Sequence, residues 1–94
     1  MTERWILRQN GRERYRIAIM DESPVRVDVM LGAFIYNDDG ARILDTWKDE
    51  CFATRAEALA WIDKTTGARL PESSSEWERV SSFDAAESAH TIHL

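Results

Sequence analysis

The first twenty residues alternate between apolar and charged positions on both sides of an Asn10-Gly11 pair. Such alternation is typical of half-buried strands, and Asn-Gly between two alternating runs is a strong hairpin signal because both residues tolerate positive φ. We therefore expect strands at Glu3–Gln9 and Glu13–Met20. Alternation gives this hairpin an apolar face, formed by Trp5, Leu7, Tyr15, Ile17 and Ile19, and a cationic face, formed by Arg4, Arg8, Arg12, Arg14 and Arg16.

Two more strands are expected after this hairpin. The segment Val25–Tyr36 alternates at first and then becomes apolar throughout, so either both of its faces are covered or Gly32 forms a bulge that changes the register. A further strand is expected at Ala41–Cys51. Its pattern places Ile43 and Trp47 on one face and Leu44 and Phe52 on the other. Turns are predicted at residues 21–24 and 37–40, where Asp, Asn, Ser, Pro and Gly gather.

A helix is predicted at Arg55–Thr66. The residues Thr54-Arg55-Ala56-Glu57 form a capping box, in which the Thr side chain and the Glu side chain each accept a hydrogen bond from a backbone N–H of the first turn. Apolar residues follow at helical spacing, and Gly67 is a suitable C-cap. The helix has one apolar stripe, which we expect to lie on the apolar face of the sheet.

The fold class that follows is α+β: a four-stranded, mostly antiparallel sheet in meander order, packed on one face by a single main helix. Residues 1–71 form this sheet-plus-helix core of a single domain, and residues 72–94 form a partly ordered C-terminal segment that packs at an edge or beneath the helix through Trp77 and Phe83. The expected pieces of this segment are a loop at Leu70–Ser75, a short helix or strand end at Glu76–Phe83, a second capping box at Asp84–Glu87 and an edge strand in His90–Leu94.

Composition narrows the class of protein. Ninety-four residues suit one domain, and a hydrophobic fraction of 44% with four Trp favours a folded chain. A single cysteine excludes an internal disulfide, and neither a signal peptide nor a membrane-length apolar run is visible. We therefore expect a cytoplasmic protein that does not contact membranes. No Gly-rich phosphate loop, nucleophile elbow or metal motif is present, so neither an enzyme nor a cofactor is expected.

The net charge of −5 is unevenly distributed. Residues 1–20 hold five Arg and two Glu, a balance of +3, whereas the rest holds seven basic and fifteen acidic residues, a balance of −8. An arginine face can bind carboxylates or phosphates, or it can be a solvated surface paired with Asp28, Asp45 or Glu3. The acidic stretches can keep the chain soluble, or they can imitate a phosphate backbone.

Two smaller groups favour structural interpretations. The pattern Glu87-x-x-His90-x-x-His93 does not place its three side chains on one helix face, so an exposed tail is expected there and no metal site. Cys51 lies among carboxylates that raise a thiol pKa, which favours a buried or half-buried structural thiol. The tryptophans are expected in the core, except that Trp77 follows a Ser run and, if exposed, could anchor a partner.

The stretch Val29–Ile62 combines a strand, an Asn-Asp-Asp-Gly turn, a second strand and the sequence Phe-Ala-Thr-Arg-Ala-Glu-Ala-Leu-Ala-Trp-Ile. This layout resembles small acidic proteins of phages and mobile elements, including certain anti-CRISPR proteins, in which a strand runs into a Thr- or Ser-capped helix that carries an aromatic residue. The resemblance implies an inhibitor that occludes a larger complex without catalysis.

The function expected from the sequence is therefore a non-enzymatic protein-binding module, with inhibition of a larger host complex as its possible role. The predicted partner-binding residues are Arg8, Arg12, Arg14, Arg16, Glu76, Trp77 and Glu78. The alternative is a nucleic-acid-binding module that uses the same arginines. A homodimer through the first strand or through the C-terminal edge also stays open.

Overall fold

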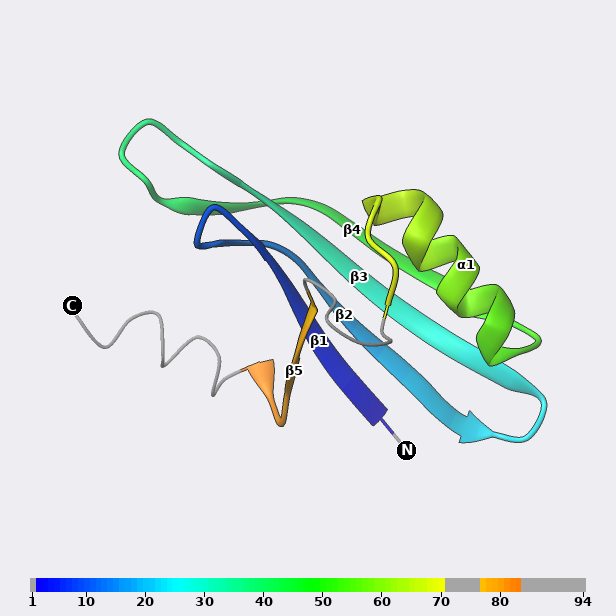
Figure 1. Cartoon of the computed structure of the whole chain (residues 1–94). Helices are drawn as coiled ribbons and strands as arrows, with labels where there is room; N and C mark the ends of the chain where they lie inside the picture. Colours follow the sequence, from blue (N-terminus) through cyan, green and yellow to red (C-terminus); the bar gives the residue numbers. More distant parts are fainter. Residues whose placement is uncertain (1, 71–76, 84–94) are drawn as a thin grey trace.

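An antiparallel five-stranded sheet carries a single helix on one face in the computed structural model, which describes residues 2–70 and 77–83 (Figure 1). The elements are β1 (Thr2–Gln9), β2 (Arg12–Ser23), β3 (Arg26–Tyr36), β4 (Arg42–Phe52), α1 (Arg55–Thr66) and β5 (Trp77–Val80). The sheet order is β4-β3-β2-β1-β5. The expected α+β class and the four-stranded meander are confirmed, and the C-terminal segment adds a fifth strand.

The fifth strand changes which strands lie at the edges of the sheet. β5 pairs antiparallel with β1, with Leu7 opposite Trp77 and Arg4 opposite Val80. The prediction that β1 is an edge is therefore wrong, because β1 is paired on both sides. Among the described strands, the edges of the sheet are β5, which has four residues, and β4, which has eleven.

The first hairpin turns at Asn10 and Gly11, whose φ angles of 56° and 78° confirm the expected tight turn. The alternation does not continue unbroken along β2. Leu7 lies opposite Tyr15, but Arg8 lies opposite Glu13, so that Arg14 is the extra residue of a β-bulge. The single cationic face expected for the hairpin is therefore interrupted at Arg14.

A second bulge lies between β3 and β4. Ala33 is opposite Thr46 and Phe34 is opposite Leu44, which leaves Asp45 as the extra residue. Gly32 is not the bulged residue; it lies opposite Trp47, and a methyl group at Gly32 would come within 3.2 Å of the Trp47 ring and 3.6 Å of Leu44 Cδ1. Trp47 and Leu44 therefore lie over the same glycine, and the prediction that they face opposite sides of the sheet is wrong.

Local capping chemistry sets both ends of α1. The Thr54 side chain accepts a hydrogen bond from the Glu57 N–H at 3.2 Å, and the Glu57 carboxylate accepts one from the Thr54 N–H at 3.2 Å. At the other end Gly67 adopts φ 77°, and its N–H bonds the Asp63 carbonyl at 2.8 Å. The predicted bounds of the helix are confirmed at both ends.

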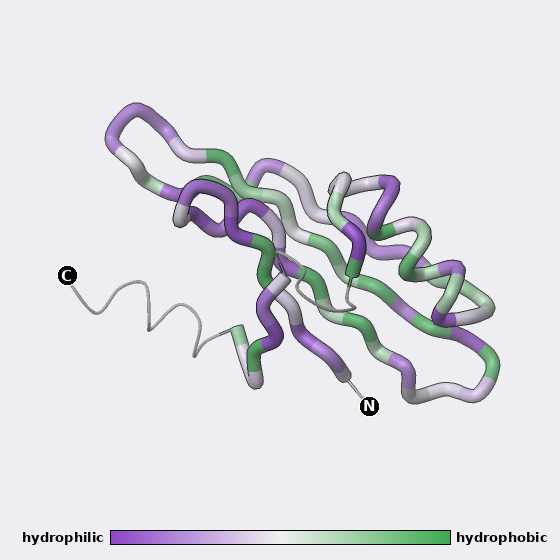
Figure 2. Tube along the Cα trace, in the orientation of Figure 1, coloured by the Kyte–Doolittle hydropathy of each residue, from purple (hydrophilic) through white to green (hydrophobic). Residues whose placement is uncertain are grey.

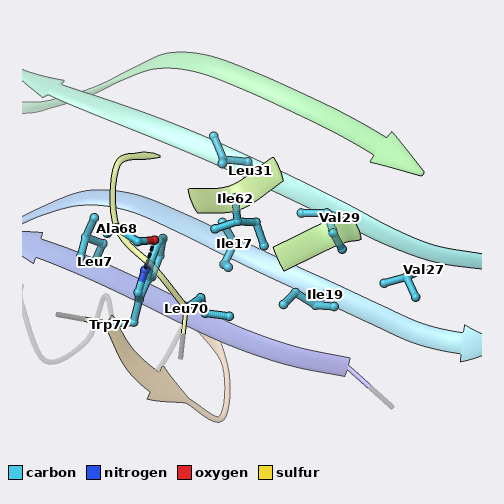
Figure 3. Packing of buried hydrophobic residues seen from close by; sticks show 11 residues of the cluster. Leu7, Ile17, Ile19, Val27, Val29, Leu31, Ile62, Ala68, Leu70 and Trp77 are labelled. Carbon is cyan, nitrogen blue, oxygen red and sulfur yellow. Dashed lines mark hydrogen bonds between the residues drawn. The ribbon is translucent and has the colours of Figure 1, made fainter. Parts of the chain in front are cut away.

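The core lies between α1 and the sheet face beneath it (Figure 3). It contains Leu7, Ile17, Ile19, Val27, Val29, Leu31, Ala58, Ile62, Ala68, Leu70 and Trp77. Trp77 is 6% exposed, and its indole N–H donates to the Ala68 carbonyl at 3.1 Å. The segment after α1 thus crosses back over the sheet and is held there by a tryptophan. Apolar residues follow the central strands beneath α1, while the turn at residues 37–41 is polar (Figure 2).

The segment predicted as a short helix or a strand end is a strand at Trp77–Val80. The predicted loop lies partly, and the second capping box and the terminal edge strand lie entirely, outside the residues that the structure describes. The same holds for Glu76 and for the two histidines.

Candidate functional site

The arginines of the first hairpin have partners within the chain. Arg8 forms an ion pair with Glu78, and Arg14 donates to the Phe34 carbonyl at 2.9 Å. The Arg12 guanidinium lies 4.9 Å from the centre of the Tyr36 ring. Arg8 and Arg14 thus bond to acceptors within the chain, and Arg12 lies against an aromatic ring. Of the two alternatives for the arginine face, the paired surface therefore fits the structure better.

The partner of Arg16 is Glu13, a buried carboxylate that the sequence prediction did not single out. Glu13 is 2% exposed and accepts hydrogen bonds from Arg16 at 2.7 and 3.2 Å and from Arg42 at 2.7 Å. Both guanidinium groups also lie over the Phe34 ring, at 5.2 and 4.5 Å from its centre. The bulge in β2 places Glu13 opposite Arg8 of β1. Arg42 comes from β4 and lies 29 positions after Glu13 in the sequence.

The acidic partners expected for the arginine face have other contacts, and one of them, Asp45, accepts a hydrogen bond from the Thr46 hydroxyl at 3.2 Å. Glu3 pairs with Arg55 of α1, and Asp28 lies 3.4 Å from Arg26 of its own strand. A polar depression next to the hairpin turn is lined by Gln9, Asn10, Arg12, Glu13, Arg14 and Tyr36, with a volume of about 410 Å³. The Tyr36 hydroxyl donates to the Glu13 carbonyl at 2.8 Å, and burial together with the nearby carboxylate raises the Tyr36 pKa.

Of the three predicted C-terminal site residues, the structure describes Trp77 and Glu78. Glu78 is exposed and paired with Arg8. Trp77 is buried, because its ring closes the core beside Ala68 and Leu70, so the exposure on which its predicted anchoring role depends is not present. Glu76 lies outside the described residues.

The largest exposed apolar side chains of the sheet lie on β4 and next to it. Leu44 is 53% exposed and Trp47 is 47% exposed, so the prediction that Trp47 belongs to the core is wrong. The reason is its position opposite Gly32: the neighbouring residue Leu31 points into the core under α1, and side chains alternate between the two faces of a strand. Trp47 therefore lies on the face away from the helix.

The tip of the β3–β4 hairpin projects past α1 (Figure 1). Near this tip Ile35 and Ile43, which are opposite each other in the ladder, are 44% and 43% exposed. Residues 37–52 hold five carboxylates against two cations, a balance of −3, and Arg42 is bonded to Glu13. We call β4, with its exposed Leu44, Trp47 and Ile43, the β4 edge.

Cys51 is exposed, which corrects the expectation of a buried or half-buried thiol. Its thiol donates a hydrogen bond to the Asp28 carboxylate at 2.9 Å, and this bond raises the Cys51 pKa. The thiol therefore stays protonated at neutral pH and is a weak nucleophile. Within residues 2–70 and 77–83, no three His, Cys, Asp or Glu side chains gather as a metal site would require.

In the described part of the chain, no helix has the length and apolar character that a membrane span needs. No family model, curated protein or solved structure matches the chain. Its function must therefore be inferred from the geometry and charge of its own residues.

Proposed function

We propose that this chain is a non-enzymatic protein-binding module that contacts its partner through the β4 edge. The observation that carries the proposal is the strand β4, whose outer side pairs with no strand of residues 2–70 and 77–83. On it a half-exposed tryptophan lies across a glycine with an exposed leucine beside it. Tryptophan is enriched among the residues that dominate binding energy at protein interfaces.

The nucleic-acid alternative has weaker support. Phosphate binding needs guanidinium groups that are free to meet phosphate oxygens, and Arg8, Arg14 and Arg16 each have a bonded partner within the chain. The chain is also acidic overall, which opposes approach to a polyanion. A steep fall of binding with salt concentration would favour this alternative over the protein partner.

The resemblance of residues 29–62 to certain anti-CRISPR proteins directs the proposal toward an inhibitory role. A small module whose contact surface is an open strand would inhibit a larger complex by occupying a surface that the complex needs. This role requires no catalytic group.

The test is site-specific photo-crosslinking in the native host, followed by measurement of affinity with the purified partner. A crosslinker in place of Lys48, on β4, should capture a protein that a crosslinker in place of Lys64, on α1, does not. Trp47→Ala should then weaken binding by about 30-fold or more, which is the effect of losing an interface residue worth about 2 kcal/mol.

Val25→Ala is the control, because Val25 is 75% exposed in the turn between β2 and β3, seven residues before Gly32, which lies opposite Trp47. It should leave the affinity unchanged. Equal effects of the two substitutions, or capture of the same proteins from both crosslinker positions, would overturn the proposal. Circular dichroism should show that both variants stay folded.

A further inference from the structure

The outer edge of β4 is a long row of backbone hydrogen-bonding groups. In an antiparallel ladder, alternate residues direct their N–H and C=O groups to one neighbour and then to the other. β4 pairs with β3 along Arg42–Phe52, and no strand among those the structure describes pairs with its other side. Such an edge is a template for an added strand.

The charge of the β4 edge selects among the strands that could pair with it. Asp45, Asp49 and Glu50 are all exposed, whereas the strand has two cations, Lys48 and Arg42, of which Arg42 is bonded to Glu13. Two further carboxylates, Asp38 and Asp39, lie in the turn that precedes β4. An incoming strand with lysines or arginines would meet opposite charges, which raise the rate of encounter and select the partner.

Two registers in which a second copy of this chain could pair with the β4 edge bring like charges together. In an antiparallel self-pair, the register that matches all eleven residues is centred on Trp47 and places Asp45 of each copy level with Asp49 of the other. The register centred on Lys48 places the two lysines opposite each other. Like charges directly opposite destabilise a pair of strands, so these registers disfavour self-association.

We propose that the β4 edge binds its partner by strand addition, and that the added strand is a basic segment of another protein. An apolar residue of this strand covers Trp47, and its cations lie level with Asp49 and Glu50, which point to opposite faces of the sheet. This inference rests on the proposed protein-binding function and specifies how the partner is held.

The probe is a ten-residue peptide of threonine and valine that contains the sequence Lys-Lys-Thr-Val, whose lysines lie level with Glu50 and Asp49 when its valine lies level with Trp47 in antiparallel pairing. The readout is amide hydrogen exchange of the ¹⁵N-labelled chain. In the free chain, alternate amides of β4 should exchange quickly, because their N–H groups face solvent. With peptide bound, these amides should exchange at least tenfold more slowly. A peptide with glutamate in place of lysine should not protect them.

Charge dependence is tested with two matched pairs of substitutions in the same hairpin. Asp49→Asn with Glu50→Gln should weaken peptide binding by about tenfold, as expected for two exposed ion pairs. Asp38→Asn with Asp39→Asn changes the net charge equally, but in the turn beyond the strand, and should change the affinity less than threefold.

Three results would overturn strand addition: binding without protection of β4 amides, equal binding of the acidic peptide, or protected β4 amides in a peptide-free dimer detected by ultracentrifugation. If a natural partner binds in a Trp47-dependent way but leaves the β4 amides unprotected, strand addition is refuted while the protein-binding function stands. Conversely, if the basic peptide protects the β4 amides but no natural partner binds in a Trp47-dependent way, only the proposed function is refuted.

Discussion

Replacement of Glu13 by glutamine tests the central feature of the arginine hairpin. Glu13→Gln keeps the size of the side chain but removes the negative charge that two guanidinium groups share. Because Glu13 is 2% exposed, water cannot take over the lost interactions at the carboxylate itself. The variant should therefore be much less stable, although it alters no hydrophobic contact.

The magnitude follows from the three hydrogen bonds that Glu13 accepts from Arg16 and Arg42. Hydrogen bonds to charged groups contribute about 1.5–3 kcal/mol each, and breaking a buried ion pair costs about 3–5 kcal/mol. Glutamine retains one acceptor, and the Arg42 side chain is 31% exposed and can be partly rehydrated. We expect the free energy of unfolding to fall by about 3 kcal/mol, a large share of the total for a domain of this size.

The assay is urea unfolding followed by circular dichroism, with Glu78→Gln as the control. Glu78 also pairs with an arginine, but its side chain is 54% exposed, so its loss should cost less than about 1 kcal/mol. Thermal unfolding of Glu13→Gln should show a midpoint lower by about 12–24 °C. If the two variants lose equal stability, Glu13 does not hold the two arginines in the way described.

Three further predictions concern other parts of the fold. Burial raises the pKa of Glu3, but hydrogen bonds and charge from Arg55 outweigh this effect, so the pKa in the folded state is lowered. The pair therefore stabilises the fold above the unfolded pKa near 4.5, and this stability is lost as the pH falls through the folded pKa. Glu3→Gln should flatten the pH dependence of the urea midpoint in that range. Gly32→Ala should displace the Trp47 ring, visible as a shift of its indole resonance in NMR spectra, and lower stability by about 1 kcal/mol. Thr54→Ala should cost about 1 kcal/mol in urea unfolding through loss of the capping bond.

The parts of the fold that the sequence predicts correctly depend on interactions between near neighbours. The Asn10-Gly11 turn needs two positive φ angles, and the ends of α1 need a capping box and a glycine three and four positions from their partners. The strands follow from the alternation of apolar residues, which is also local. Such features can be found by reading along the chain.

The features that were missed depend on residues distant in sequence. Two bulges shift the register, and each moves side chains to a face that simple alternation does not predict: Arg14 in β2 and Leu44 in β4. The burial of Glu13 needs Arg42 from another strand. The exposure of Trp47 follows from the sheet order, because the composition of β4 does not reveal that it lies at an edge and that its tryptophan faces away from the helix.

The two edges of the sheet differ in what their tryptophans contribute. At β5 the indole of Trp77 is buried and hydrogen-bonded, so this short edge strand belongs to the core and contributes to folding. At β4 nearly half of the Trp47 side chain remains in water, so it contributes less to folding and has apolar area to lose when a partner binds. Folding alone does not require apolar side chains along an open strand, where they favour aggregation. Carboxylates on the same strand oppose self-pairing and would attract a strand of opposite charge, so the proposed recognition role would account for both features together.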